Sequence, residues 1–363
     1  MNAQDFEDLL KAGATDTETY LGNYLEPVFK GIIYDLSGGW YHSAKVHNKF
    51  GFDLTLGVNL AFVPEDQKNF IFNNADYTVL ALTSGLPSDS LPTAMGGKTT
   101  KEISVSIPTT ITNPNTGLEE EVLQTTSFNA VNGFEEDIED AGIPSGVPLP
   151  MVQIGVGLPL KTDVKIRYVP ETEMEEISLK LFGIGLQHDL LQHFSKKDSK
   201  FDLSLLGAFT KSTVIATPED GTYGVNQEII LSFDSYTAQI VAGFDLKYIN
   251  FYAGLGYVSG SSSVTVNGDY SYTYEIKDQH GDPIAGVPDK TITLHDPIQL
   301  DYSVSGAKAT VGMRLNIGFL KVFADYTFQG YDTANIGVAF SFDKKKKKVK
   351  EEEKKEEIEI EKI

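Results

Sequence analysis

The residues best suited to metal or acid–base chemistry are few and poorly spaced in this sequence. The closest histidines form two pairs, His42/His47 and His188/His193, each five residues apart. Metal ligands on one helix face are three or four residues apart, so neither pair has that spacing. No Gly-x-Ser-x-Gly nucleophile motif occurs. We therefore predict no catalytic residue, no metal, no cofactor and no enzymatic activity.

Two acidic stretches, Glu119–Glu121 and Glu135–Asp137, are the remaining candidates for cation binding. They lack the alternating Asp/Asn and the glycine of a calcium loop, so we interpret them as solvated loop surface.

Composition excludes further classes. The 363-residue chain has no cysteine, which excludes disulfides, thiol nucleophiles and cysteine metal sites. Its formal charge of -21 argues against a nucleic acid partner, because phosphates are bound by Lys and Arg. No run of 18 apolar residues occurs, so a transmembrane helix is not expected.

A second group of polar residues alternates with apolar ones. Over residues 310–342, Met313, Leu315 and Ile317 fall on one face of a strand, and Arg314 and Asn316 fall on the other. In a membrane β-barrel these two faces contact lipid and lumen. The main lumen-facing candidates are Arg167, Arg314, Lys321 and Asp325. Further inward positions are Asp53, Asn59, Lys165, Gln239, Asn250 and Asn316, with Phe323 the one apolar exception in its strand.

Mixed charges across a narrow lumen have two interpretations. They can form a packed network that stiffens the barrel, or they can line a selective pore. We favour packing and keep conduction as the alternative.

The same alternation predicts strands through most of the chain. Their ranges are 50–63, 76–82, 101–109, 149–158, 161–169, 174–187, 201–216, 228–244, 247–264, 298–317, 320–331 and 334–342. We predict an all-β fold, a transmembrane antiparallel barrel of about 12 strands. Residues 83–148 have the least regular pattern and leave the count open between 10 and 14.

Connection lengths predict an orientation. Short periplasmic turns are expected at 159–160, 245–246 and 318–319, and long extracellular loops at 218–227 and 265–297. The connections 187–200, 170–173 and 331–333 do not follow that rule.

The N-terminal segment is the one part with a helical pattern. Thr15 and Glu18 have capping-box spacing, and apolar residues then recur with a period of 3.6 up to the stop at Ser37-Gly38-Gly39. We expect either a plug inside the barrel or an amphipathic helix on a membrane surface, and we favour the plug. The predicted plug residues are Tyr20, Tyr24, Phe29 and Trp40.

Three parts follow from these patterns: a helical plug at 1–49, a barrel at 50–343 and a charged tail at 344–363. The tail has nine lysines and seven glutamates, too polar to pack a core, and is expected in the periplasm as a disordered or frayed helical segment. The start Met1-Asn2-Ala3-Gln4 is similar to the remnant of a removed signal peptide.

Several motifs carry a resemblance to a known group. They are Gly146–Pro159 (GVPLPMVQIGVGLP), Lys165–Pro170 (KIRYVP), Gly183–Asp189 (GIGLQHD) and Gly39-Trp40-Tyr41. With them the chain resembles an uncharacterised family of Bacteroidota outer-membrane proteins, itself similar to long-chain fatty acid transporter barrels with an N-terminal hatch. The chain departs from those transporters in its lower strand count and in lacking their Asn-Pro-Ala hatch signature.

The resemblance implies an outer-membrane location and contact with outer-membrane lipid. We expect a plugged channel that passes hydrophobic or small amphipathic solutes. The alternative is a structural or accessory barrel that holds envelope protein partners without transport.

Overall fold

Ten antiparallel strands form a closed ring in the computed structural model, which describes residues 9–112, 116–144, 146–174, 176–194, 200–217, 224–246, 248–277 and 282–343. The ring order is β11-β10-β9-β8-β7-β1-β16-β15-β14-β12, and it closes through pairing of β12 with β11. The strands are β1 (Phe52–Ala61), β7 (Val147–Leu158), β8 (Thr162–Met174), β9 (Ile177–Asp189), β10 (Phe201–Ala216), β11 (Gly224–Asp245), β12 (Ile249–Tyr274), β14 (Ile298–Ile317), β15 (Leu320–Phe328) and β16 (Thr333–Phe342). The prediction of an antiparallel barrel is confirmed.

The ten strands lie within the predicted range of 10 to 14, although the central value of about 12 is too high by two. The segments predicted at 76–82 and 101–109 form β3 (Leu80–Leu82) and β5 (Glu102–Thr112), which pair with β6 (Glu119–Asn129) in a separate sheet. Alternation marks a half-buried strand, but it does not say which sheet the strand joins.

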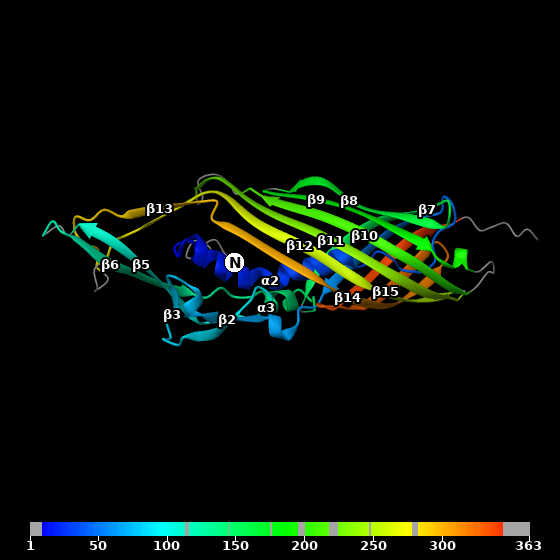
Figure 1. Ribbon diagram of the computed structural model, residues 1–363, viewed down its shortest axis with the longest axis horizontal. Coiled ribbons are helices and arrows are strands. Elements are labelled where there is room, and N and C mark those ends of the chain that lie inside the picture. Colours follow the sequence, from blue (N-terminus) through cyan, green and yellow to red (C-terminus); the bar gives the residue numbers. More distant parts are fainter. Residues whose placement is uncertain are drawn as a thin grey trace, which may run out of the picture.

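Residues 62–146, which connect β1 to β7, fold into a unit that we call the hood. Besides β3, β5 and β6 it contains a two-stranded sheet of β2 (Asn69–Asn73) and β4 (Ser88–Pro92) and the short helix α3 (Glu135–Asp140). Two 3-10 turns, η1 (Glu65–Gln67) and η2 (Asn74–Asp76), complete it. In Figure 1 the hood extends from one end of the barrel, together with β13 (Lys290–His295), which pairs with β12.

The two barrel ends differ as the connection lengths predicted. The turns between β7 and β8, β11 and β12, and β14 and β15 lie at one end, with the start of β1 and the end of β16. We call this the turn end, and the opposite one the hood end. The longer connection between β9 and β10, with η3 (Leu191–His193), also lies at the turn end.

Along the long strands, from the turn end to the hood end, the outer face changes from apolar to polar and the inner face from polar to apolar. On β12, Phe251, Leu255 and Tyr257 are exposed near the turn end, whereas Ser259 and Ser261 occupy the outer face farther on. The inner face changes in the opposite sense, from polar residues and glycines to buried apolar residues. The same change occurs on β14, where the outer face runs from Ile317 to Ser303 and Asp301.

Aromatic pairs border the exposed apolar part of the wall. Phe52 stacks on Phe342 at 5.1 Å between ring centroids near the turn end. On the hood side, Phe209 packs on Tyr236 at 4.7 Å. An outer apolar band between two aromatic girdles is the surface that a barrel presents to lipid.

The helix α2 (Gly13–Ser37) runs lengthwise inside the strands (Figure 1). It contacts β14, β11, β12, β7, β1 and β10, so the wall surrounds it. No helix among the described residues is long and apolar enough to cross a membrane.

The helix ends as predicted but begins earlier. It stops at Ser37, and Gly39 follows with a positive φ of 66°. The predicted capping box at Thr15 is wrong, because Thr15 lies inside the helix and the N-cap is Ala12, without a side-chain cap. Asp16 instead accepts hydrogen bonds from the backbone N–H groups of residues 78–80 in the hood, at 2.8 to 3.0 Å.

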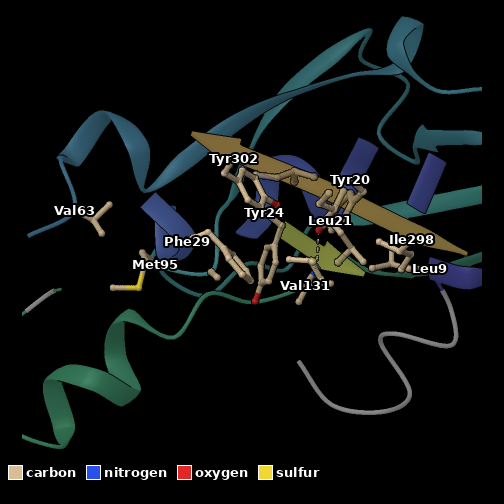
Figure 2. Packing of buried hydrophobic residues seen from close by; sticks show 14 of the residues in the cluster. Leu9, Tyr20, Leu21, Tyr24, Phe29, Val63, Met95, Val131, Ile298 and Tyr302 are labelled. Atoms are coloured by element: carbon tan, nitrogen blue, oxygen red, sulfur yellow. Dashed lines mark hydrogen bonds between the residues drawn. The ribbon is translucent and has the colours of Figure 1, made fainter. Parts of the chain in front are cut away.

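The main apolar core lies at the hood end, between α2, the inner faces of the long strands and the hood. Figure 2 shows Tyr20, Tyr24 and Phe29 extending from α2 into this cluster. Phe29 stacks between Phe233 at 5.4 Å and Tyr302 at 5.2 Å, while Tyr20 packs on the hood. The long strands therefore bury apolar side chains inside the molecule beyond the band that faces outward.

Candidate functional site

The C-terminal end of α2 is held by cations that project from the barrel wall. A helix end leaves carbonyl groups without intrahelical partners and carries a partial negative charge. The last turn of α2 contains no basic residue of its own. Arg167 on β8 donates to the carbonyl oxygens of Leu36 at 3.2 Å and Gly38 at 2.7 Å. Lys308 on β14 donates to the Ser37 carbonyl at 3.2 Å and to its hydroxyl at 3.0 Å.

The segment that follows α2, residues 38–51, continues through the lumen toward the turn end. We call residues 13–51, α2 with this segment, the luminal segment. Trp40 is 1% exposed and lies against Arg167, whose Cζ is 3.9 Å from the ring centroid. Lys165 donates to the Trp40 carbonyl at 2.8 Å. Gly185 on β9 leaves room for the indole, because a Cβ there would lie 2.8 Å from it.

Two histidines of the luminal segment bind two carboxylates of the wall. His42 Nε2 lies 2.9 Å from Asp53 Oδ2, and His42 Nδ1 lies 3.0 Å from the Arg314 guanidinium. Since a guanidinium only donates, His42 accepts at Nδ1 and donates from Nε2, which makes it a neutral imidazole. His47 Nδ1 lies 2.9 Å from Asp163 Oδ2 and its Nε2 lies 3.5 Å from Asp53 Oδ2.

Phe323, the apolar exception on a polar face, stacks on this histidine. Its ring centroid is 5.1 Å from that of His42, and Phe323 is buried on the inner wall. The exception is therefore a packing contact with the luminal segment.

A further polar layer crosses the lumen beside Tyr41. Tyr41 donates to Gln239 Oε1 at 3.0 Å. Asp325 accepts from the Tyr252 hydroxyl at 3.0 Å and from Asn335 Nδ2 at 2.9 Å. Most polar groups in this part of the lumen have partners, as expected for a network that fixes one arrangement.

A polar cavity of about 530 Å³ opens at the turn end, between the luminal segment and the wall. Its charged lining residues are Lys45, Lys165, Arg314, Lys321, Asp53, Asp163, Asp245 and Asp343, together with His42 and His47. The described residues hold no group of three or more His, Cys, Asp or Glu side chains arranged for a metal ion.

A family model described as "Family of unknown function (DUF6588)" matches residues 1–342. The chain belongs to that family. A comparison with curated proteins returned no match.

Solved structures similar to this DUF6588 protein include outer-membrane barrels of several functions. The outer membrane protease OmpT from Escherichia coli has 10% identity over 81% of this chain and 97% of its own, at a TM-score of 0.25. The ferric-catecholate import receptor Fiu from E. coli K12 has 10% identity over 81% of this chain and 57% of its own, at a TM-score of 0.26. OprB from Pseudomonas putida has 10% identity over 81% and 92%, at a TM-score of 0.16.

The structure places the predicted luminal residues at three levels. Arg167 holds the end of α2, Asp325 lies in the layer with Tyr252, and Arg314 and Lys321 line the turn-end cavity. Trp40 lies against Arg167 in the polar part of the lumen. The other predicted plug residues, Tyr20, Tyr24 and Phe29, lie in the apolar core at the hood end. The tail 344–363 lies outside the described residues.

Lys308 and the two histidine–carboxylate pairs were not identified from the sequence. Lys308 lies on the same strand face as Thr310 and Arg314. Extending the alternating stretch by two residues toward the N-terminus would therefore have identified it. The five-residue spacing of His42 and His47 does not fit a metal pair on a helix face and predicts no other partner. Their partners Asp53 and Asp163 lie on strands, and nothing local in the sequence links them.

Proposed function

We propose that this protein is a β-barrel of the Gram-negative outer membrane whose lumen is a plugged channel, with the luminal segment as the plug. An outer-membrane location is supported by the exposed apolar band and its two aromatic girdles. That band needs a nonpolar solvent, because exposed apolar patches of this extent are rare on soluble monomers.

The observation that carries the channel proposal is how the plug is held near the turn end. There the contacts are hydrogen bonds from Arg167, Lys308 and Lys165 to backbone carbonyls, beside a small apolar cluster that includes Trp40 and Tyr41. Water can replace such bonds at a net cost of about 1.5–3 kcal/mol each, because the donors are charged. A plug held in this way can leave while exposing only this small apolar cluster at that end, in contrast to the large core at the hood end.

The polarity of the inner wall favours an amphipathic molecule as the transported solute. At the hood end it presents apolar side chains such as Val264 and Leu300, and at the turn end it presents charged and amide groups. A path that changes from apolar to polar favours hydrophobic or small amphipathic molecules over simple ions.

A reversible disulfide between α2 and the barrel wall, which we call the lock, gives the sharpest test, because the chain has no cysteine of its own. A Cβ built at Gly31 on α2 would lie 3.7 Å from the Ala61 Cβ on β1. This distance is within the range of about 3.5–4.5 Å found in disulfides. The same Cβ would lie 2.8 Å from a methyl of Val147, so the variant is Gly31→Cys/Ala61→Cys with Val147→Ala.

Conductance in planar bilayers is measured for this variant oxidised and reduced, and for a chain lacking residues 9–37. We expect silence when oxidised, rare openings when reduced and a steady pore without the helix. The reduced protein is the matched control for the lock. A helix-deleted barrel that folds, by heat-modifiable gel migration, exposes Trp40 to iodide and yet conducts nothing would contradict the channel.

The single tryptophan gives a second readout of the plug. Trp40 emission should shift to the red and become accessible to iodide in the helix-deleted barrel, and in the reduced lock variant under conditions that open it.

A structural or accessory barrel is the second candidate, and the hood favours it. Leu118 and Leu123 there are 67% and 62% exposed, beyond the outward-facing band. Co-purification of envelope proteins that is lost on replacing both by Ser would support this function. Migration of the native protein as a lone monomer, with no captured partner, would count against it.

A further inference from the structure

The cavity at the turn end contains cations that lack a carboxylate partner. Among the described residues, Lys165, Arg314 and Lys321 have no Asp or Glu oxygen within 4.0 Å, since the ion pairs of this region involve other cations. Each donates only to a neutral acceptor. These acceptors are the Trp40 carbonyl, His42 Nδ1 and the Gly318 carbonyl, respectively.

The carboxylates of the same cavity are already occupied. Asp53 binds His42 and the Gly155 N–H, and Asp163 binds the His47 ring and backbone. Asp245 pairs with Lys45 at 2.8 Å, and Asp343 accepts from Asn48 at 2.9 Å. Carboxylates and Lys or Arg cations are thus equal in number among these lining residues. The carboxylates already have donors, whereas Lys165, Arg314 and Lys321 can still donate hydrogen bonds to a ligand.

Arg314 is the centre of this unused capacity. Its Nε is buried and has no hydrogen-bond partner in the described part of the chain. Asn316 is two residues along the same face of β14 and lies opposite Lys321 on β15, so Arg314 and Lys321 are diagonal neighbours. A guanidinium with a lysine beside it is the arrangement that recognises carboxylate and phosphate oxygens.

We propose that the turn-end cavity binds a soluble oxyanion, a carboxylate or phosphate group of a small organic molecule, between Arg314 and Lys321. The cavity volume of about 530 Å³ is within the range of about 300–1,000 Å³ for small-molecule sites. The lining side chains face the lumen, so the strands separate the site from lipid head groups. The site does not require that the barrel conducts, so its test is independent of the channel.

The test is calorimetric titration of inorganic phosphate into the full-length protein in phosphatidylcholine nanodiscs, at constant ionic strength with sodium chloride. The wild type should bind at one saturable site. Arg314→Gln and Lys321→Gln should each weaken binding at least tenfold. Lys161→Gln removes the same charge at the same barrel end, from a residue that does not line the cavity, and should change affinity less than twofold.

In phosphatidylcholine nanodiscs, three outcomes would overturn the proposal. They are wild-type heats equal to those of empty nanodiscs, unchanged affinity in both cavity variants, and equal weakening in Lys161→Gln. Lys321→Gln keeps the test valid if Arg314→Gln fails to fold, because Lys321 is half-buried at a turn. Loss of phosphate binding when phosphatidylglycerol replaces part of the lipid would assign the site to a lipid phosphate and refute a soluble ligand.

Discussion

Arg167 combines three roles that usually fall to separate residues. It neutralises the end of a helix dipole, satisfies two buried carbonyl groups and stacks on Trp40. Its Nε also donates to Gln153 at 3.1 Å, which fixes the plane of the guanidinium. A single cation on the wall therefore sets where α2 ends and how the chain turns after it.

Replacing Arg167 by Gln should destabilise the folded barrel by about 2–4 kcal/mol, because buried carbonyls lose their donors. Arg167→Lys should recover only part of this, since an ammonium group lacks the planar fork that reaches both carbonyls. Urea unfolding in detergent, followed by Trp40 emission, measures both values. Equal stability of the Gln variant and the wild type would show that Arg167 does not hold the helix end.

His47 lies in residues 38–51, outside the barrel strands, and its protonation should affect stability. Burial lowers its pKa, but the hydrogen bond to Asp163 and the charges of Asp163 and Asp53 outweigh burial and the repulsion from Lys165, so its pKa is raised above 6.5. A group whose pKa is raised by folding adds stability that is complete below its unfolded pKa and is lost as pH rises through the folded one.

We therefore expect the wild type to exceed His47→Gln in stability most at pH 5, with the difference shrinking as pH rises above about 6.5. The midpoint of heat-modifiable gel migration between pH 5 and 9 gives this difference. In an Asp163→Asn background the pH dependence should largely disappear. A difference between wild type and His47→Gln that grows with pH would reverse the assigned sign.

At the scale of elements, small residues on the wall make room for the luminal segment. Gly185 on β9 faces Trp40, while Gly207 on the neighbouring strand β10 faces outward and has no atom within 4 Å of an added Cβ. Gly185→Ala should cost about 1–3 kcal/mol through overpacking against the indole. Gly207→Ala is the matched control and should be neutral or slightly stabilising. Equal effects would show that the wall does not fit closely around Trp40.

The strand faces were predictable because the period of two is local information. In β1 the exposed and buried positions from Phe52 to Ala61 follow the predicted parity without a slip in register. The turn end was predictable for the same reason, since short turns are visible as breaks between alternating stretches.

The hood and the helix start depend on contacts between distant segments. Strand β5 alternates as a barrel strand does, and only its pairing with β3 and β6 assigns it to the hood. Likewise Thr17 donates to the carbonyls of Leu9 and Gly13, so the chain turns before Thr15 and the expected cap is not used. Of the candidate site, the charged wall positions could be predicted, but their pairing with the luminal segment could not.

At the scale of the whole molecule, the exchange of polarity along β11, β12 and β14 divides the barrel into two zones. Toward the turn end the outer face is apolar and the lumen is polar. Toward the hood the outer face is polar and the interior is an apolar core. The boundary between these zones is where we expect one surface of the bilayer to lie.

Matched arginine substitutions on one outer face test that boundary. Ile240 on β11 is 53% exposed and pairs with Leu255 within the apolar band, whereas Ser261 on β12 is exposed beyond it. Ile240→Arg should destabilise the barrel in lipid by about 2–4 kcal/mol, because a charge at mid-membrane is costly. Ser261→Arg places the same charge in water and should change stability by less than about 0.5 kcal/mol. Equilibrium refolding into liposomes measures both, and a cost for Ser261→Arg as large as for Ile240→Arg would mean that the bilayer extends over the hood end of the strands.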